Sequence, residues 1–184
     1  YFDMMQALRQ KNQAGFKGTL EFFPEEGKYH FDGHRSCNMR MTPEETRAHE
    51  GRCPACGKKV TVGVMHRVNV LSDRKQGSRP DGAFGFESMI PLVEILSEIH
   101  GGGVNTKKIT GEYFKLLGKF GPELTILRTC SLDTLRQAGQ QVLAEALHKM
   151  RQGKVSVEPG YDGEYGKVRV FKAGEKLYNQ PALF

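Results

Sequence analysis

The feature that most constrains this chain is a group of cysteines and a histidine between positions 34 and 57. His34 and Cys37 are separated by two residues, and Cys53 and Cys56 repeat this spacing within Cys-Pro-Ala-Cys-Gly. A two-residue spacer lets both ligand atoms of a pair face one ion, and Gly57 lets the backbone fold back beneath it. The separation of the two pairs is roughly that of zinc ribbons. We therefore predict a closed, structural Zn²⁺ site with three sulfur ligands and one imidazole.

The fourth ligand of this site has alternatives. His30 is the main alternative to His34, and His49 and His66 are more remote candidates. A redox-active Cys-x-x-Cys pair would not require Cys37, and the βαβ pattern that usually surrounds such a pair is missing. Zinc is therefore the preferred interpretation.

A second interpretation places an open, hydrolytic metal site in the same region. Its ligands would be Glu25, Glu26, His30, Asp32 and His34. The alternation of His30, Asp32 and His34 is also typical of a half-exposed strand, which we favour. Metal analysis distinguishes the two sites, because the structural zinc site would have mainly sulfur ligands and the hydrolytic site would have oxygen and nitrogen ligands.

Composition limits the remaining classes of function. The chain has 184 residues, 38% hydrophobic and 26% charged, which is typical of one or two globular domains. We expect no membrane span and no signal peptide. Four cysteines, three of them in a metal pattern, favour a reducing cytoplasm over a disulfide scaffold. A net charge of +6 is compatible with nucleic acid but not diagnostic of it.

Local signals predict the elements of the first half. We expect a helix over residues 1–10, a strand over 18–23, and a strand passing into a helix over 60–74. Thr42, Pro43 and Glu45 form a capping box at the start of a short helix between the two ligand pairs. Residues 77–85 have the composition of a linker, so we predict domains at 1–76 and 77–184.

The second half begins with a pattern of two helices and a glycine turn. An apolar helix face precedes Gly101, Gly102 and Gly103, and Asn105 or Thr106 then caps a helix that opens with lysines. This order resembles the helix-hairpin-helix family. A second, degenerate copy follows, in which Gly139 alone marks the turn, and the resemblance covers about residues 91–153.

Such a turn suits the backbone of DNA or RNA. Glycines let the chain approach a phosphate, and the free amides and positive dipole end of the next helix bind an anion. Lys107 and Lys108 add charge at that position. In the first half, Lys58, Lys59, Arg67 and Arg74 are further candidates for phosphate contact. Ordinary helical hairpins and solvated basic faces show the same residues.

The chain closes with a predicted β-hairpin. Residues 154–158 and 166–171 alternate as strands, and Asp162-Gly163 is typical of a turn. Tyr161 and Tyr165 in this turn either stack on bases or pack the hairpin.

Four longer segments resemble the endonuclease Q family, phosphoesterases of the PHP type with a zinc ribbon. They are residues 21–35, 53–57, 63–68 and 159–166. The resemblance implies a metal-dependent nuclease that nicks DNA beside deaminated bases and abasic sites. Its catalytic PHP domain would precede Tyr1, so we expect this chain to be inactive alone, and no catalytic residue is assigned. Relatives are often labelled DNA helicases, but the chain lacks a Gly-x-x-x-x-Gly-Lys-Ser/Thr loop.

Together these observations predict an α+β fold. A small zinc-ribbon-like domain is followed by a helical, helix-hairpin-helix-like domain with a C-terminal β-hairpin. The expected partners are DNA and the missing N-terminal catalytic domain of the same protein.

Overall fold

The computed structural model describes residues 1–10, 15–75, 77–172 and 174–175. The chain divides into two compact units. Unit 1 is Tyr1–Ser88 with Pro159–Gly166, and unit 2 is Met89–Glu158 with Lys167–Phe184. The chain passes from one unit to the other three times, since residues 159–166 belong with the N-terminal unit. The predicted domains at 1–76 and 77–184 stay a prediction.

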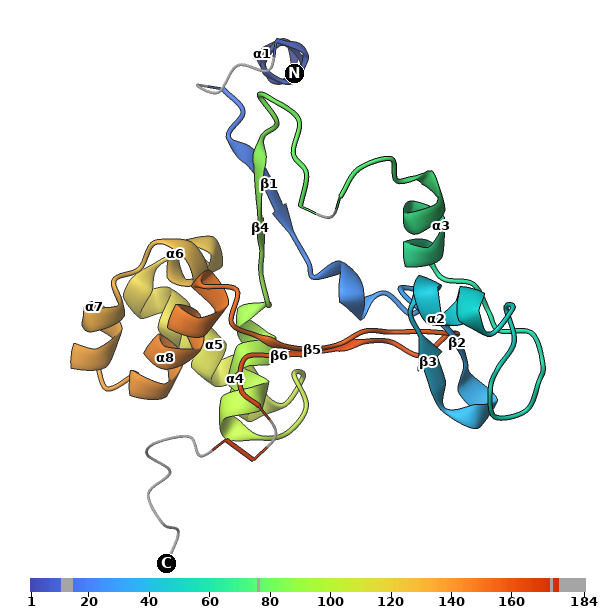
Figure 1. Cartoon of the computed structure of the whole chain (residues 1–184). Coiled ribbons are helices and arrows are strands. Elements are labelled where there is room, and N and C mark those ends of the chain that lie inside the picture. The colour runs from blue at the N-terminus through green and yellow to red at the C-terminus, as the bar shows by residue number, and fades with distance from the viewer. Residues whose placement is uncertain (11–14, 76, 173, 176–184) are drawn as a thin grey trace, which may run out of the picture. The chain divides into compact units, whose positions relative to one another are not determined.

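Unit 1 is built from short elements (Figure 1). Its helices and strands are α1 (Phe2–Arg9), β1 (Gly18–Glu21), β2 (Asp32–His34), β3 (Met39–Met41), α2 (Pro43–Ala48), α3 (Val64–Leu71) and β4 (Gly85–Ser88), with 3₁₀ turns at Pro24–Glu26 and Arg35–Cys37. The predicted capping box is present, because the Thr42 side chain accepts from Glu45 N and the Glu45 carboxylate accepts from Thr42 N.

The pairing of β1 with β4 was not predicted. The two strands are parallel, with Gly18 opposite Gly85 and Glu21 opposite Ser88. Gly18 must lack a side chain, because an added Cβ would lie 2.2 Å from the Gly85 carbonyl oxygen. The predicted linker over 77–85 therefore leads into a strand whose few residues carry no alternating pattern.

Unit 2 is a small helical bundle. Its elements are α4 (Leu92–His100), α5 (Lys107–Phe120), α6 (Glu123–Arg128), α7 (Leu132–Gln137), α8 (Gln141–Arg151), β5 (Ser156–Glu158) and β6 (Lys167–Arg169). The predicted apolar face of α4 is buried through Leu92, Ile95 and Leu96. These side chains pack in the same core as Ile109 of α5 and Leu147 of α8, which are both 0% exposed.

The predicted C-terminal hairpin is present. Strands β5 and β6 are antiparallel, with Val157 opposite Val168. The helices and small sheets together confirm the α+β class. Among the described residues, no helix combines the length and apolarity needed to span a bilayer.

Candidate metal centre and nucleic-acid surfaces

The first ligand pair lies at a tight reversal of the chain. His34 ends β2, and a 3₁₀ turn carries the chain from Arg35 to Cys37. Asn38 then adopts a left-handed conformation with φ of 51°, which returns the chain into β3. Because β2 and β3 pair with His34 opposite Met39, the reversal holds both ligand side chains at one end of the hairpin.

The second ligand pair lies in a closed loop. Gly57 N donates to the Cys53 carbonyl and Cys53 N to the Lys58 carbonyl, both at 2.8 Å. Gly57 has φ of 71°, the left-handed conformation that glycine adopts most readily. The Arg52 guanidinium donates to the Gly57 carbonyl at 3.0 Å and braces the loop.

The two pairs converge on one point. The ligand atoms of His34, Cys37, Cys53 and Cys56 all lie within 4.8 Å of one another, so the group could hold a metal ion. Cys56 Sγ and His34 Nδ1 are 3.4 Å apart. Among the described residues, this is the one such group with three or more ligands.

The electrostatics of the group suit a cation. Hydrogen bonding with Cys56, together with burial, raises the pKa of Cys37 to about 11. At Cys56, a hydrogen bond from the Lys58 backbone lowers the pKa and favours thiolate. Three sulfurs this close repel one another as thiolates, and a bound cation removes that repulsion. The donor set therefore fits a structural metal ion.

The alternative histidines have other partners. The His30 ring contacts the Pro24 carbonyl at 3.0 Å through Nδ1, and the His66 Nδ1 lies 2.6 Å from the Asp32 carboxylate. His49 is the residue that ends α2. The proposed open metal site around Glu25, Glu26, His30 and Asp32 is therefore not favoured, since these residues do not gather as a metal group in the described chain.

The buried Asp32 has a role that the sequence did not reveal. It is 0% exposed and accepts from Gly63 N at 2.7 Å as well as contacting His66. Gly63 is the N-cap of α3, so the carboxylate fixes the start of this helix to β2. His66 lies 34 positions further on, and no local pattern connects the two residues.

The predicted basic residues of unit 1 lie on its surface. Lys58 and Lys59 are exposed beside the second ligand pair, and Arg67 is exposed on α3. Arg74 is also exposed and lies 3.5 Å from the Asp73 carboxylate. These positions are accessible to a phosphate backbone.

The predicted glycine turn connects α4 to α5. Gly101, Gly102 and Gly103 are all exposed, and Thr106 is the N-cap of α5, with its side chain accepting from Ile109 N. Asn105, the other predicted cap, precedes it. Lys107 and Lys108 open the helix and are exposed.

The three glycines of this turn do not serve the same purpose. Gly101 and Gly102 have φ of 70° and 103°, so the backbone requires glycine there. Gly103 has no positive φ, and an added Cβ would meet nothing within 4 Å. The fold therefore does not require glycine at position 103, which leaves a bare backbone facing solvent.

The second predicted turn joins α7 to α8. Gly139 has φ of 81° and is exposed, and Gln140 caps α8 without a side-chain hydrogen bond. This turn is shorter than the first and carries no lysine pair.

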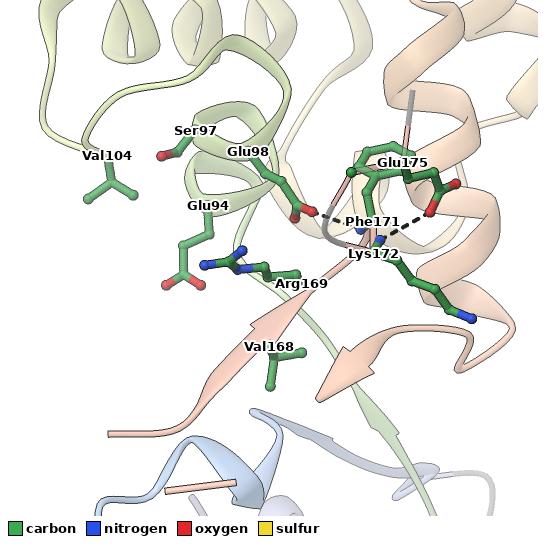
Figure 2. A pocket seen from close by; sticks show the side chains of 10 residues that line it. Glu94, Ser97, Glu98, Val104, Val168, Arg169, Phe171, Lys172 and Glu175 are labelled. Carbon is green, nitrogen blue, oxygen red and sulfur yellow. Dashed lines mark hydrogen bonds between the residues drawn. The ribbon is translucent and has the colours of Figure 1, made fainter. Parts of the chain in front are cut away.

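Unit 2 also has a cavity of about 490 Å³ beside α4 and β6 (Figure 2). The Glu98 carboxylate accepts from Val170 N and Phe171 N at 2.9 and 2.8 Å and so links α4 to the end of β6. Glu94 and Glu175 also line the cavity. Arg169 and Lys172 line it too, and a lining of three carboxylates and two cations does not favour phosphate, so we do not include this cavity in the candidate nucleic-acid surface.

Known proteins match part of this chain. The family model described as MJ0043 C-terminal domain matches residues 91–154, which span α4 to α8. The uncharacterized protein MJ0043 of Methanocaldococcus jannaschii is 34% identical over 145 residues, 79% of this chain and 18% of that protein. The uncharacterized protein YqxK of Bacillus subtilis is 27% identical over 164 residues, 89% of this chain and 38% of that protein. The chain thus spans less than half the length of either relative.

Two solved structures share the fold. The lesion-specific endonuclease PfuEndoQ from Pyrococcus furiosus has a TM-score of 0.71 and 26% identity, over 82% of this chain and 37% of that one. Endonuclease Q in complex with a 27-mer duplex substrate carrying an abasic lesion has a TM-score of 0.68 and 24% identity, over 88% of this chain and 41% of that one. The predicted resemblance to the endonuclease Q family is confirmed, because the chain shares the fold of both structures.

Proposed function

We propose that this chain is the DNA-binding, zinc-stabilised portion of a repair nuclease like endonuclease Q, and that it does not cut DNA alone. The shared fold with PfuEndoQ over 82% of the chain is the main support. The related complex contains duplex DNA with an abasic lesion. In this proposal, the nuclease acts at deaminated bases through catalytic residues that lie outside this chain.

The metal in the proposal is Zn²⁺. Three cysteines and one histidine satisfy its preferred tetrahedral coordination and leave no open position for substrate. His34, Cys37, Cys53 and Cys56 would hold the ion, and it would join the β2–β3 hairpin to the loop at Cys53–Cys56. Its role is therefore structural.

The DNA-gripping surface would lie mainly on unit 2. Of the 27 basic and 21 acidic residues, 13 and 8 fall in unit 2, so it carries +5 of the net +6 charge. We assign the helix-hairpin-helix role to the α4–α5 turn, where exposed glycines precede the N-terminus of a 14-residue helix. Its unpaired amides and Lys107 and Lys108 would contact phosphates without reading sequence.

The catalytic domain would dock on the β1–β4 pair. Parallel sheets are almost always covered on both faces, yet this pair leaves Leu20 and Phe86 exposed at 42% and 67%, and Phe22, just after β1, is exposed at 68%. Two strands alone are also fewer than an independently stable sheet needs. We infer that further strands of the same protein extend this pair.

A charge-reversal experiment tests DNA binding. Replacing Lys107 and Lys108 by Glu should weaken duplex binding strongly and lower the salt dependence by about two phosphate contacts. The matched control reverses Lys154 and Lys167, which are exposed in unit 2, are not part of the turn and change the net charge equally. Gel-shift titrations across a salt series measure both. If both variants lose the same amount of duplex affinity, the turn has no specific role, and binding depends only on the overall positive charge of unit 2.

A further inference from the structure

The turn Pro159–Gly166 carries two tyrosines in opposite environments. Tyr161 is used by the fold: its hydroxyl donates to Asn38 Oδ1 at 2.8 Å, and its ring covers Gly33, where an added Cβ would lie 2.3 Å from Tyr161 Cδ2. Tyr165 is 72% exposed. Of the two tyrosines that could stack on bases, Tyr165 is therefore available and Tyr161 is not.

The turn is held by several hydrogen bonds against the rest of unit 1. The amides of Gly160, Gly163 and Gly166 donate to the carbonyls of Glu25, Lys28 and Glu26 at 2.8, 2.9 and 3.0 Å. The Arg35 amide donates to the Asp162 carboxylate at 2.6 Å. Anchored at these points, the turn presents the Tyr165 ring on a fixed backbone, which reduces the entropy lost when a ligand binds to it.

A lysine lies between this ring and a second exposed tyrosine. Lys28 Nζ is 5.6 Å from the Tyr29 ring centroid and 5.7 Å from the Tyr165 ring centroid. Tyr29 is 45% exposed. Within the described residues Lys28 has no ion-pair partner, whereas the neighbouring Glu164 carboxylate lies 3.7 Å from the Arg35 guanidinium. The result is two aromatic faces that share one uncompensated positive charge.

We propose that Tyr29, Lys28 and Tyr165 form a stacking platform for unpaired nucleotides of DNA. Exposed aromatic rings bind unstacked bases of any sequence through their π-faces, and a nearby ammonium neutralises the connecting phosphate. A base-paired duplex hides these faces within its own stack, so single-stranded DNA is the ligand class that fits. The inference rests on the proposed DNA-binding function and adds a second surface, on unit 1.

Tyrosine fluorescence gives a direct readout of stacking, because the chain has six tyrosines and no tryptophan. The 184-residue chain is titrated with an oligothymidylate of roughly 16 nucleotides, the upper end of single-strand site sizes. We expect quenching in the wild type. Tyr165→Ala should lose much of the quenching and bind about 5- to 150-fold more weakly, the range for one base–aromatic stack.

Two variants separate stacking from packing. Tyr165→Phe keeps the π-face and should retain the affinity, and Lys28→Ala should reduce the single-strand salt slope by about 0.7. The control is Phe114→Ala, which removes a similarly exposed aromatic ring on α5, at 64%, and should change neither affinity nor quenching. Because Tyr165 is exposed, its variants should keep the wild-type melting temperature.

The outcomes show whether the stacking platform or the proposed DNA-binding function is wrong. If Tyr165→Ala binds and quenches like the wild type while Lys107→Glu/Lys108→Glu loses duplex binding, the platform is wrong and the proposed function stands. If Tyr165→Phe behaves like Tyr165→Ala, the hydroxyl rather than the ring is important, and the platform is again wrong. If the wild type binds neither single strands nor duplex, both proposals fail.

Discussion

The two units are stabilised in different ways. Unit 2 has a continuous apolar core in which side chains from α4, α5, α6, α7 and α8 are fully buried. In the described part of unit 1, the hydrophobic cluster consists of Met41, Cys53 and Val60, with Cys37 and Met39 partly buried against them. Two of these five residues are candidate metal ligands.

This difference shows where the folding free energy must come from. Three buried apolar side chains cannot offset the conformational entropy of ordering a unit of this size. A metal ion linking two chain segments adds stabilisation to this small core, because the binding free energy of a structural site is also folding free energy. We therefore expect unit 1 to depend on its metal and unit 2 to be independent of it.

Metal removal should give the largest effect. Structural zinc sites contribute about 10–16 kcal/mol of apparent binding free energy, so a strong chelator should unfold the region between β2 and α3. Far-UV circular dichroism should retain the helical signal of unit 2, while amide resonances of unit 1 lose their dispersion. Metal analysis should give one zinc per chain.

Cysteine variants provide the control for this experiment. Cys53→Ala should reproduce the loss, whereas Cys130→Ala should not, because Cys130 lies outside the metal group. If the chain loses its metal and the amide resonances of unit 1 stay dispersed, unit 1 does not depend on the metal.

A core substitution tests the other unit. Leu147 is 0% exposed in α8, so Leu147→Ala should cost about 2–5 kcal/mol of unfolding free energy. Zinc content should not change. Leu124→Ala, on a side chain that is 52% exposed, should stay within about 0.5 kcal/mol of the wild type in denaturant titrations. Loss of zinc from the Leu147 variant would show that the units are not independent.

Alanine substitutions at two glycines of the α4–α5 turn should have smaller effects on stability, and these effects should be opposite in sign. Gly103→Ala should stabilise unit 2 by roughly 0.4–1 kcal/mol, because alanine restricts the unfolded chain without strain in the fold. Gly101→Ala should destabilise it by about 1 kcal/mol, since φ is 70° there. If Gly103 serves close approach to phosphate, its alanine variant should nevertheless bind duplex DNA more weakly, which gel-shift titration would measure. Unchanged binding would show that position 103 does not contact the DNA backbone closely.

The smallest expected effect concerns Glu94. Burial raises the pKa of this carboxyl above its ordinary value of 4.5, so the folded state holds the proton more tightly than the unfolded state does. The stability from this group is therefore present at low pH and is lost as pH rises through the raised pKa. Glu94→Gln should slightly raise the melting temperature at neutral pH and give no gain near pH 4.

The matched variant for Glu94 is Glu145→Gln. Glu145 is exposed on α8, and it should show no such pH-dependent difference in thermal melts. The size of the Glu94 effect stays small because solvent screens a largely exposed carboxyl.

Local sequence signals predicted much of this fold, but they did not predict which distant segments pair with each other. The Thr42–Glu45 capping box and the Thr106 cap depend on neighbours within three residues, and the structure confirms both caps. The four candidate metal ligands could be grouped because their spacing is itself a local signal. The zinc identity and the DNA contacts stay predictions.

The missed features all join distant segments. Strand β4 pairs with β1 across more than sixty residues, and the four residues of β4, which include one glycine, carry too little β-propensity to be recognised. Asp32 and His66 were considered as metal ligands because their types suit that role, yet the fold pairs them with each other. Which partner a histidine finds is decided by tertiary packing.

The turn at Pro159–Gly166 has a consequence for the order of biosynthesis. Its carbonyl partners lie at Glu25, Glu26 and Lys28, so a nascent chain that has emerged only to Ser88 cannot complete unit 1. Helices α4 to α8 of unit 2 are all translated before the turn becomes available. An expression fragment ending at residue 88 would leave the surface over Gly33 uncovered, whatever metal is supplied.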